Sequence, residues 1–446
     1  MKRFYTIILI AVSLRLCAGQ ETPDIHTNFQ IVLPAEKREF PEALPPGAAP
    51  GFKIRGTKGW AWTPEQYLAE IPFIAEIKMN FLMNCYISMF DIEHHKKWYD
   101  GEANRWWEEF PATKKAAYEK VVRSAQEHGL QFCFSMNPNL FSKRMVNDQS
   151  RENVDLLFKH YQWMQGLGVK WFNLALDDAV GGINAATQAK VANDLFHRLR
   201  MADPEAQFIF CPTYYWGDGT LPKQKPYLEE LARSLDKDIY VFWTGERVVG
   251  RVTRKAAETF RGIVGHRVIL WDNYPVNDGQ ATMHLGPLVD RDADLCEVLD
   301  GYMSNPMREQ NEMNRIPLAT CADYSYNPRA YDPMRSIAQA ILLQADEPGE
   351  REVLRDLVET YPGMLLDSAA HGRTGFNPVR FQMESILAVP QSRPAALAYL
   401  AYLKELSNRL GKSFPERYGP GKATLGADIA AGQVAITARY PGKAAN

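Results

Sequence analysis

The residues best suited to chemistry in this sequence are two adjacent carboxylates, Asp177 and Asp178. They end the stretch "KWFNLALDD", in which an apolar run over residues 170–176 leads directly into the pair. Two carboxylates a few ångströms apart repel each other, so one of them resists ionising and can hold a proton. Such a pair suits general acid–base catalysis. Aspartate also caps helices and fills turns, so the interpretation needs support from the surrounding residues.

Other apolar runs also end in polar or aromatic residues. These residues are Tyr215, Thr244, Asp272, Asn273, Asp278 and Asn305. Aromatic faces stack on sugar rings, while carboxylates and amides bind sugar hydroxyl groups. If the ends of these runs meet in space, the set predicts a carbohydrate site around the carboxylate pair.

Short β-type runs alternate with amphipathic, helix-type stretches from residue 51 onward. The runs cover residues 51–56, 80–87, 130–136, 170–176, 207–215, 238–245, 267–274 and 301–306. This alternation implies parallel strands covered by helices. Eight such units predict an α/β fold, a (β/α)8 TIM barrel, whose polar strand ends all face one mouth. A doubly wound open sheet is the alternative, but no G-x-G-x-x-G motif follows the first run.

Residue patterns divide the chain into four parts. We expect a signal peptide at 1–19, a Pro-rich extended lead-in at 20–51, the catalytic barrel at 52–335 and a mainly helical C-terminal region at 336–446. Apolar residues at three- and four-residue spacing support the helices of the last part. Its final stretch, "AGQVAITARY" at 431–440, is a candidate strand.

The N-terminus has the pattern of a secretory signal. Lys2 and Arg3 precede an apolar stretch over residues 4–14, and the small residues of "CAG" precede a cut near Gly19. We therefore expect export to a periplasm or out of the cell. No later stretch reaches 18 apolar residues, so we expect no stable membrane insertion.

Charge and cysteine usage exclude several classes of protein. The 51 basic and 53 acidic residues nearly cancel, which argues against a nucleic-acid partner. The five cysteines outside the signal are widely spaced and form no disulfide or zinc pattern. His94 and His95 are neighbours in a charged stretch without a third ligand nearby, so we expect neither a metal nor another cofactor.

Seven motifs together resemble glycoside hydrolase family 84, the O-GlcNAcase and bacterial β-N-acetylglucosaminidase family. They are "LDDAV" (176–180), "FCPTYYWGDG" (210–219), "VFWTGERVV" (241–249), "LWDNYPVND" (270–278), "LGPL" (285–288), "GYMSNPM" (301–307) and "IPLATCADYSYNP" (316–328). The likeness spans about residues 52–335 and is strongest from residue 170 onward. It implies hydrolysis of terminal N-acetylglucosamine in a glycan or glycoconjugate, with retention of configuration.

The resemblance also implies how the carboxylate pair works. In the family the 2-acetamido oxygen of the substrate attacks C1 and forms an oxazoline, so the enzyme supplies no nucleophile. By position, Asp177 would hold and polarise the acetamido N–H. Asp178 would be the general acid and then the general base. A carboxylate held ionised by that N–H would make its neighbour keep a proton at neutral pH.

Further substrate contacts follow from matching motif positions. Tyr215 would donate a hydrogen bond to the acetamido oxygen, and Asn273 would position the acetamido group. The residues implied to line the acetyl pocket are Cys211, Thr244, Val248 and Trp271. Those implied to contact the rest of the sugar are Asp278 and Asn305 through their side chains and Gly56 through its carbonyl group.

Two stretches depart from the family pattern. The family's "GFYGRPW" is "GTKGWAW" at 56–62, which places Lys58 where an aromatic residue is usual. Residues 84–91 lack the lysine of the family's "APKDD", which binds a sugar hydroxyl. We expect Lys58 to swing into the mouth and replace that lysine. The changes keep two alternatives open: the same mechanism on a different or substituted amino sugar, and a carbohydrate-binding homologue with weak turnover.

Overall fold

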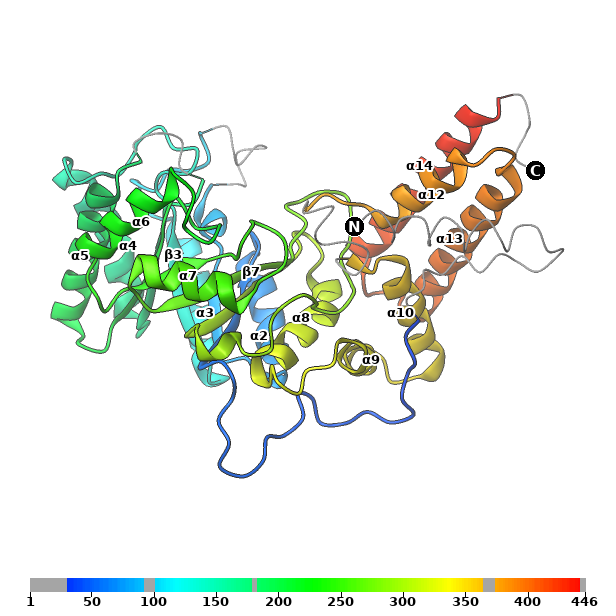
Figure 1. Ribbon diagram of the computed structural model, residues 1–446, viewed down its shortest axis with the longest axis horizontal. Helices are drawn as coiled ribbons and strands as arrows, with labels where there is room; N and C mark the ends of the chain where they lie inside the picture. Colours follow the sequence, from blue (N-terminus) through cyan, green and yellow to red (C-terminus); the bar gives the residue numbers. More distant parts are fainter. Residues whose placement is uncertain (1–29, 92–100, 179–182, 364–373, 442–446) are drawn as a thin grey trace.

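Eight parallel strands close into a barrel in the computed structural model, which describes residues 30–91, 101–178, 183–363 and 374–441. Each strand pairs with the next along the chain, and β8 pairs with β1. The predicted (β/α)8 barrel is therefore confirmed (Figure 1). The strands are β1 (Ile54–Gly59), β2 (Phe81–Asn84), β3 (Gln131–Met136), β4 (Trp171–Ala175), β5 (Gln207–Cys211), β6 (Tyr240–Trp243), β7 (Val268–Pro275) and β8 (Gly301–Asn305).

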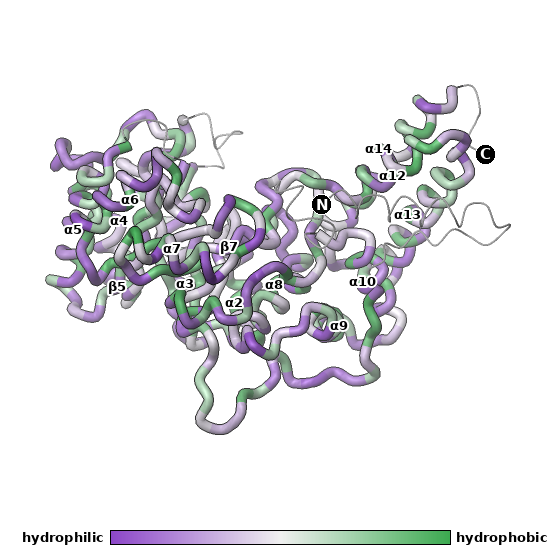
Figure 2. Tube along the Cα trace, viewed as in Figure 1, coloured by the Kyte–Doolittle hydropathy of each residue, from purple (hydrophilic) through white to green (hydrophobic). Residues whose placement is uncertain are grey.

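Helices and short 3-10 turns connect the strands, and one further helix follows the last strand. They are α2 (Pro64–Glu76), η1 (Tyr86–Met89), α3 (Ala112–Glu127), α4 (Arg151–Gly166), α5 (Ala185–Ala202), α6 (Gln224–Ser234), α7 (Arg254–Val264), η2 (Leu295–Glu297) and α8 (Asn311–Tyr326). Helix α2 has a capped start: the Thr63 side chain accepts a hydrogen bond from the backbone N–H of Gln66, and Pro64 is the first helical residue. Hydrophilic and hydrophobic stretches alternate along the barrel helices (Figure 2), as expected when one face is buried.

Side chains alternate between the inside and the outside of the barrel, and this alternation positions the site. In β4, Trp171 and Ala175 belong to the apolar cluster inside the barrel. Phe172 and Leu174 belong to the other cluster, which packs against the helices. Because the side-chain period of a strand is two, the residue that next points inward beyond Ala175 is Asp177.

The C-terminal region is a helical bundle beside the barrel (Figure 1). Its helices are α9 (Pro333–Gln344), α10 (Pro348–Thr360), α12 (Pro378–Ala388), α13 (Arg393–Ser413) and α14 (Gly419–Arg439). The expected strand at 431–440 is wrong, because most of it lies in α14. Buried Leu425, Gly432 and Ile436 follow a helical spacing. Gly432 lets the helices approach, since a Cβ there would lie 3.1 Å from Met383.

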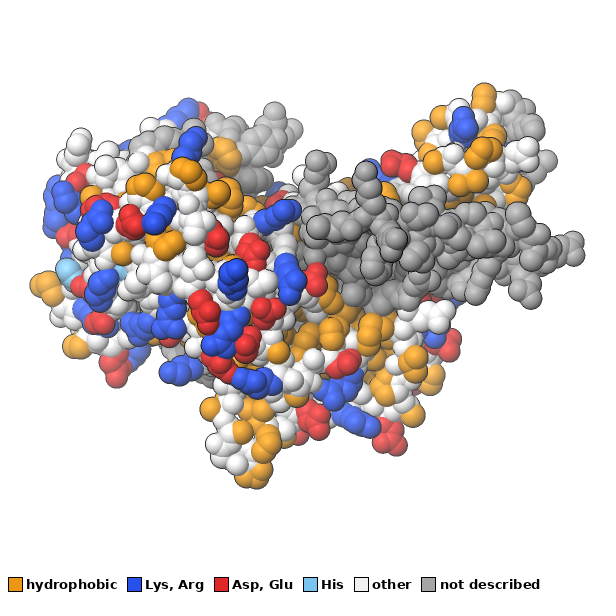
Figure 3. All heavy atoms as spheres, in the orientation of Figure 1, with side chains coloured by type: hydrophobic (Ala, Val, Ile, Leu, Met, Phe, Trp, Pro, Cys, Tyr) orange, Lys and Arg blue, Asp and Glu red, His pale blue; other side chains and the backbone are white. Residues whose placement is uncertain are grey.

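The described part of the lead-in packs against the C-terminal helices. The backbone N–H of Ile31 donates to Glu359 of α10 at 2.7 Å, and that of Arg38 donates to Gln339 of α9 at 3.1 Å. On the face seen in Figure 3, acidic and basic side chains are interspersed over the barrel. Within the described residues, none of the helices is both long and apolar enough to span a bilayer. The expected signal peptide lies outside the described residues.

Candidate functional site

Asp177 lies two residues beyond the end of β4 and is buried inside the mouth of the barrel, with 5% of its surface exposed. Both of its carboxylate oxygens accept hydrogen bonds. The Tyr86 hydroxyl donates to Oδ2 at 2.6 Å, and the Asn137 amide donates to Oδ1 at 3.0 Å. These donors come from η1 and from the end of β3, so neighbouring units of the barrel hold the carboxylate in one orientation.

Asp178 occupies a different environment although it is the next residue. Its side chain is exposed, and its backbone has φ 54°, in the left-handed region that few non-glycine residues adopt. The Tyr215 hydroxyl donates to its Oδ1 at 2.9 Å. The turn therefore separates a buried, fixed carboxylate from one that solvent or a bound molecule can reach.

Burial controls the protonation of the pair. Burial and then the charge of Asp178 raise the pKa of Asp177 to about 6, while the Tyr86 hydrogen bond and the charge of Lys58 oppose the rise. The family resemblance implies that Asp178 keeps the proton at neutral pH. The structure instead gives Asp177 a raised pKa, because removing a carboxylate from water outweighs its two hydrogen bonds. The predicted division of roles requires a further donor to Asp177, such as an amide N–H.

The raised pKa of Asp177 predicts a pH-dependent loss of stability. Between about pH 4 and pH 6 the folded carboxyl group still holds a proton that the unfolded one has released, so the free energy of unfolding falls as pH rises. A rise from 3.8 to about 6 corresponds to about 3 kcal/mol. From pH 4 to pH 8, we expect the free energy of unfolding of Asp177→Asn to rise by about 3 kcal/mol relative to that of wild type. Urea unfolding of both proteins at each pH measures this, and a constant difference between them would contradict it.

Three of the residues implied for the acetyl pocket lie together in the mouth. Cys211, Thr244 and Trp271 are all at least 95% buried. Thr244 holds Tyr215, because its backbone N–H donates to the Tyr215 carbonyl oxygen at 2.8 Å. The indole N–H of Trp271 is buried without a hydrogen-bond partner among the described residues. A buried donor of this kind needs a partner, and a polar ligand group in the mouth can supply it.

Two asparagines, from the adjacent strands β7 and β8, lie beside these residues. The Asn305 amide donates to Asn273 Oδ1 at 2.8 Å, and the Asn273 amide donates to the Val248 carbonyl oxygen at 2.7 Å. Within the described residues, the side-chain oxygen of Asn305 has no partner although it is buried. Val248 joins this group through its backbone, while 37% of the residue is exposed.

Asp278 and Gly56 occupy the rim and the wall of the mouth. Asp278 is exposed and accepts a hydrogen bond from the Trp60 indole at 3.4 Å. The Arg308 guanidinium lies 5.3 Å from the same ring. Gly56 lies within the strand ladder, opposite Phe81 of β2. A Cβ at Gly56 would lie 2.0 Å from the Phe81 carbonyl oxygen, so the position has no room for a side chain.

Lys58 points into the mouth, as expected, but Tyr86 and Asn137 were not predicted as site residues. Lys58 is 3% exposed, and its ammonium lies 4.5 Å from the centroid of the Trp271 ring. Asn137 could have been found from the two-residue period, because it continues the inward series through Cys133 of β3. No comparable signal identifies Tyr86, which lies in a 3-10 turn.

The expectation that Asp272 faces the mouth is wrong. Its carboxylate accepts from Arg291 Nε at 2.9 Å and from the Tyr302 hydroxyl at 2.9 Å. Tyr302 belongs to the cluster outside the barrel wall. Asp272 therefore points away from the site, because it alternates with the inward-facing Trp271 and Asn273.

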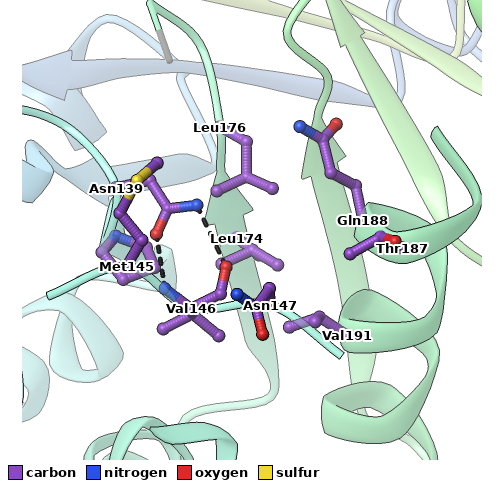
Figure 4. Close-up of a pocket in the computed structure, with 10 residues that line it drawn as sticks. Asn139, Met145, Val146, Asn147, Leu174, Leu176, Thr187, Gln188 and Val191 are labelled. Carbon is purple, nitrogen blue, oxygen red and sulfur yellow. Dashed lines mark hydrogen bonds between the residues drawn. The ribbon is translucent and has the colours of Figure 1, made fainter. Parts of the chain in front are cut away.

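A separate cavity lies on the outer side of β4. It has a volume of about 70 Å³ and is bounded by Leu174, Leu176 and Val191, with Asn139 bonded to Val146 at its side (Figure 4). The leucines point outward, so this space is not part of the mouth. His94 and His95 lie outside the described residues. Within the described residues, no three His, Cys, Asp or Glu side chains gather closely enough to hold a metal ion.

The chain is similar to known proteins in sequence and in fold. Residues 53–359 match the family described as beta-N-acetylglucosaminidase. Protein O-GlcNAcase of Mus musculus is 26% identical over 320 residues, covering 66% of this chain and 33% of the mouse protein. The Rattus norvegicus protein of the same name is 27% identical over 233 residues, covering 49% of this chain and 25% of the rat protein. The chain thus spans a third or less of these relatives.

A solved structure supports the fold. An O-GlcNAc hydrolase variant from Thermobaculum terrenum superposes with a TM-score of 0.69 at 22% identity, covering 87% of this chain and 84% of that one. At this identity the likeness concerns the fold alone. The family match extends over most of the barrel and into the C-terminal helices. Because it covers more than half of the chain, the protein belongs to the beta-N-acetylglucosaminidase family, glycoside hydrolase family 84.

Proposed function

We propose that the protein is a retaining β-N-acetylglucosaminidase that uses the acetamido group of its own substrate as the nucleophile. The observation that carries the proposal is the unlike placement of two neighbouring carboxylates. Asp177 is buried and fixed by two donors, while Asp178 is exposed and contacts Tyr215. A fixed carboxylate suits orienting an amide, and an accessible one suits proton transfer.

The proposed reaction has two steps. In the first, Asp177 accepts a hydrogen bond from the acetamido N–H while the acetamido oxygen attacks C1 and closes an oxazoline ring that stays protonated on nitrogen. The bond from C1 to the glycosidic oxygen breaks, and Asp178 protonates that departing oxygen. In the second, Asp178 takes a proton from water, which attacks C1 and opens the oxazoline. Two inversions at C1 give net retention. Tyr215, whose hydroxyl lies 2.9 Å from Asp178, would stabilise the acetamido oxygen between the steps.

A second candidate is the same chemistry on a different or substituted amino sugar. The observation that favours it is the ammonium of Lys58 inside the mouth, at a position that is aromatic in the family pattern. A cation there changes which substituents the sugar can carry. A panel of substituted and internal N-acetylated amino sugars separates this candidate from the first.

Hydrolysis of an aryl β-N-acetylglucosaminide by the purified protein tests the proposal. We expect turnover, with the β-anomer as the first product seen by proton NMR. The matched control is the aryl β-glucoside, which has a hydroxyl in place of the acetamido group and should not be hydrolysed. Equal hydrolysis of both substrates would contradict substrate assistance, and binding of N-acetylglucosamine without turnover would favour a carbohydrate-binding protein.

A further inference from the structure

Lys58 is a buried cation held among aromatic rings. Its ammonium lies 4.5 Å from the ring centroid of Trp271, 5.3 Å from that of Tyr86 and 5.8 Å from that of Trp60. Within the described residues, no carboxylate lies within ion-pair distance of Lys58, and no hydrogen bond to it is formed. Aromatic faces attract a cation but compensate only part of the cost of removing it from water. A nearby negative charge is therefore expected to contribute to its stability.

Asp177 provides that charge, and Tyr86 connects the two residues. The Tyr86 ring contacts the ammonium, and its hydroxyl donates to Asp177 Oδ2 at 2.6 Å. Burial keeps the pKa of Tyr86 well above its ordinary value, so this hydroxyl remains a donor. The positive charge of Lys58 also opposes the rise in the pKa of Asp177 and of the Cys211 thiol.

Lys58 is the cation whose charge most lowers the pKa of Asp177. The other titratable groups around the carboxylate are Cys85, Tyr86, Asp178, Cys211 and Tyr215. Burial raises the pKa values of Tyr86, Cys211 and Tyr215, so these groups are neutral at neutral pH. Asp178 opposes ionisation of Asp177. Removing Lys58 would therefore leave that repulsion opposed mainly by the Tyr86 hydrogen bond.

We propose that Lys58 is a positioning residue that keeps Asp177 ionised, acting by its charge and through Tyr86, so that β1 sets the pH range of the carboxylate pair. The role rests on the proposed function and adds a residue to it. It differs from the expected contact of Lys58 with a sugar hydroxyl, because a hydroxyl contact changes substrate binding, whereas support of Asp177 changes the pH dependence of the reaction.

The experiment is the pH profile of kcat/KM on the aryl substrate for wild type, Lys58→Met, Lys58→Arg and Tyr86→Phe. Loss of the charge or of the hydroxyl makes Asp177 harder to ionise, so the acidic limb moves to higher pH. We expect Lys58→Met to move it by about one pH unit, which lowers kcat/KM about tenfold on the acid side. Tyr86→Phe should move the acidic limb in the same direction. Lys58→Arg keeps the positive charge, so its acidic limb should stay at the wild-type pH. Arg308→Met is the matched control, because it removes a cation over the Trp60 ring and leaves both Lys58 and the Tyr86–Asp177 hydrogen bond in place.

A second measurement separates this inference from the proposed function. The carbon-13 titration of the Asp177 carboxyl group, assigned with Asp177→Asn, needs no substrate. The midpoint of this titration should rise in Lys58→Met and should be unchanged in Arg308→Met. If the wild type hydrolyses nothing, the proposed function fails while this titration still decides the role of Lys58. An unchanged midpoint in a folded Lys58→Met, or a rise in KM with an unmoved acidic limb, would overturn the inference.

Discussion

Asp178→Asn is expected to lower kcat on an aryl β-N-acetylglucosaminide by about 100- to 10,000-fold, the range that general acid–base catalysis contributes. The amide cannot protonate the departing oxygen or take a proton from water. It keeps the volume of the side chain and can still accept the hydrogen bond from Tyr215. The fold should therefore be unchanged, and the loss should appear in kcat more than in KM.

The leaving group makes this prediction sharper. A phenol that departs easily needs little help from an acid. In Asp178→Asn the rate of the first step should therefore fall less for its glycoside than for a glycoside with a poor leaving group. The matched control is Asp155→Asn, which removes an exposed carboxylate on α4 and should leave kcat unchanged. Equal losses for all leaving groups would show that Asp178 does not act as the acid in bond cleavage.

Arg291→Met is expected to lower the free energy of unfolding by about 3–5 kcal/mol, the cost of leaving one partner of a buried ion pair without the other. The side chains of Arg291 and Asp272 are 2% and 1% exposed, and their closest atoms lie 2.5 Å apart. The Tyr302 hydroxyl that also donates to Asp272 cannot neutralise its charge. Urea unfolding at neutral pH measures the loss.

The double variant Asp272→Leu with Arg291→Met is the control for this prediction. It replaces both charges with apolar groups, and such replacements in protein interiors are often neutral. We therefore expect the double variant to be more stable than Arg291→Met alone. A single variant as stable as wild type would show that the pair contributes little and that Asp272 finds another partner.

Sequence patterns were sufficient for the barrel and for most positions of the site. Alternating strand and helix patterns predict parallel strands, and the two-residue period then decides which side chains enter the mouth. Asp177, Trp271, Asn273 and Asn305 all follow that period beyond or at their strand ends. Asp272 differs from the expectation because it alternates with the inward-facing Trp271 and Asn273 and so points outward, to Arg291 and Tyr302.

The remaining features depend on contacts between segments that are distant in sequence. Tyr86 reaches Asp177 across 91 residues from a 3-10 turn, whose direction no periodicity fixes. The raised pKa of Asp177 depends on burial, which only the assembled mouth creates. The prediction of a strand at 431–440 is wrong because alternating small and branched residues also fit a helix, which packs here through Gly432. In each case packing outweighed local preference.

The backbone at Asp178 implies a trade-off between stability and activity. A left-handed φ of 54° costs a non-glycine residue about 1 kcal/mol or more, and glycine would adopt it freely. Glycine, however, carries no carboxyl group. Selection for a more stable protein would thus favour losing the side chain that the proposed reaction needs, and selection for turnover would retain it. A drift from aspartate to glycine at this position would then mark a chain that has exchanged turnover for binding.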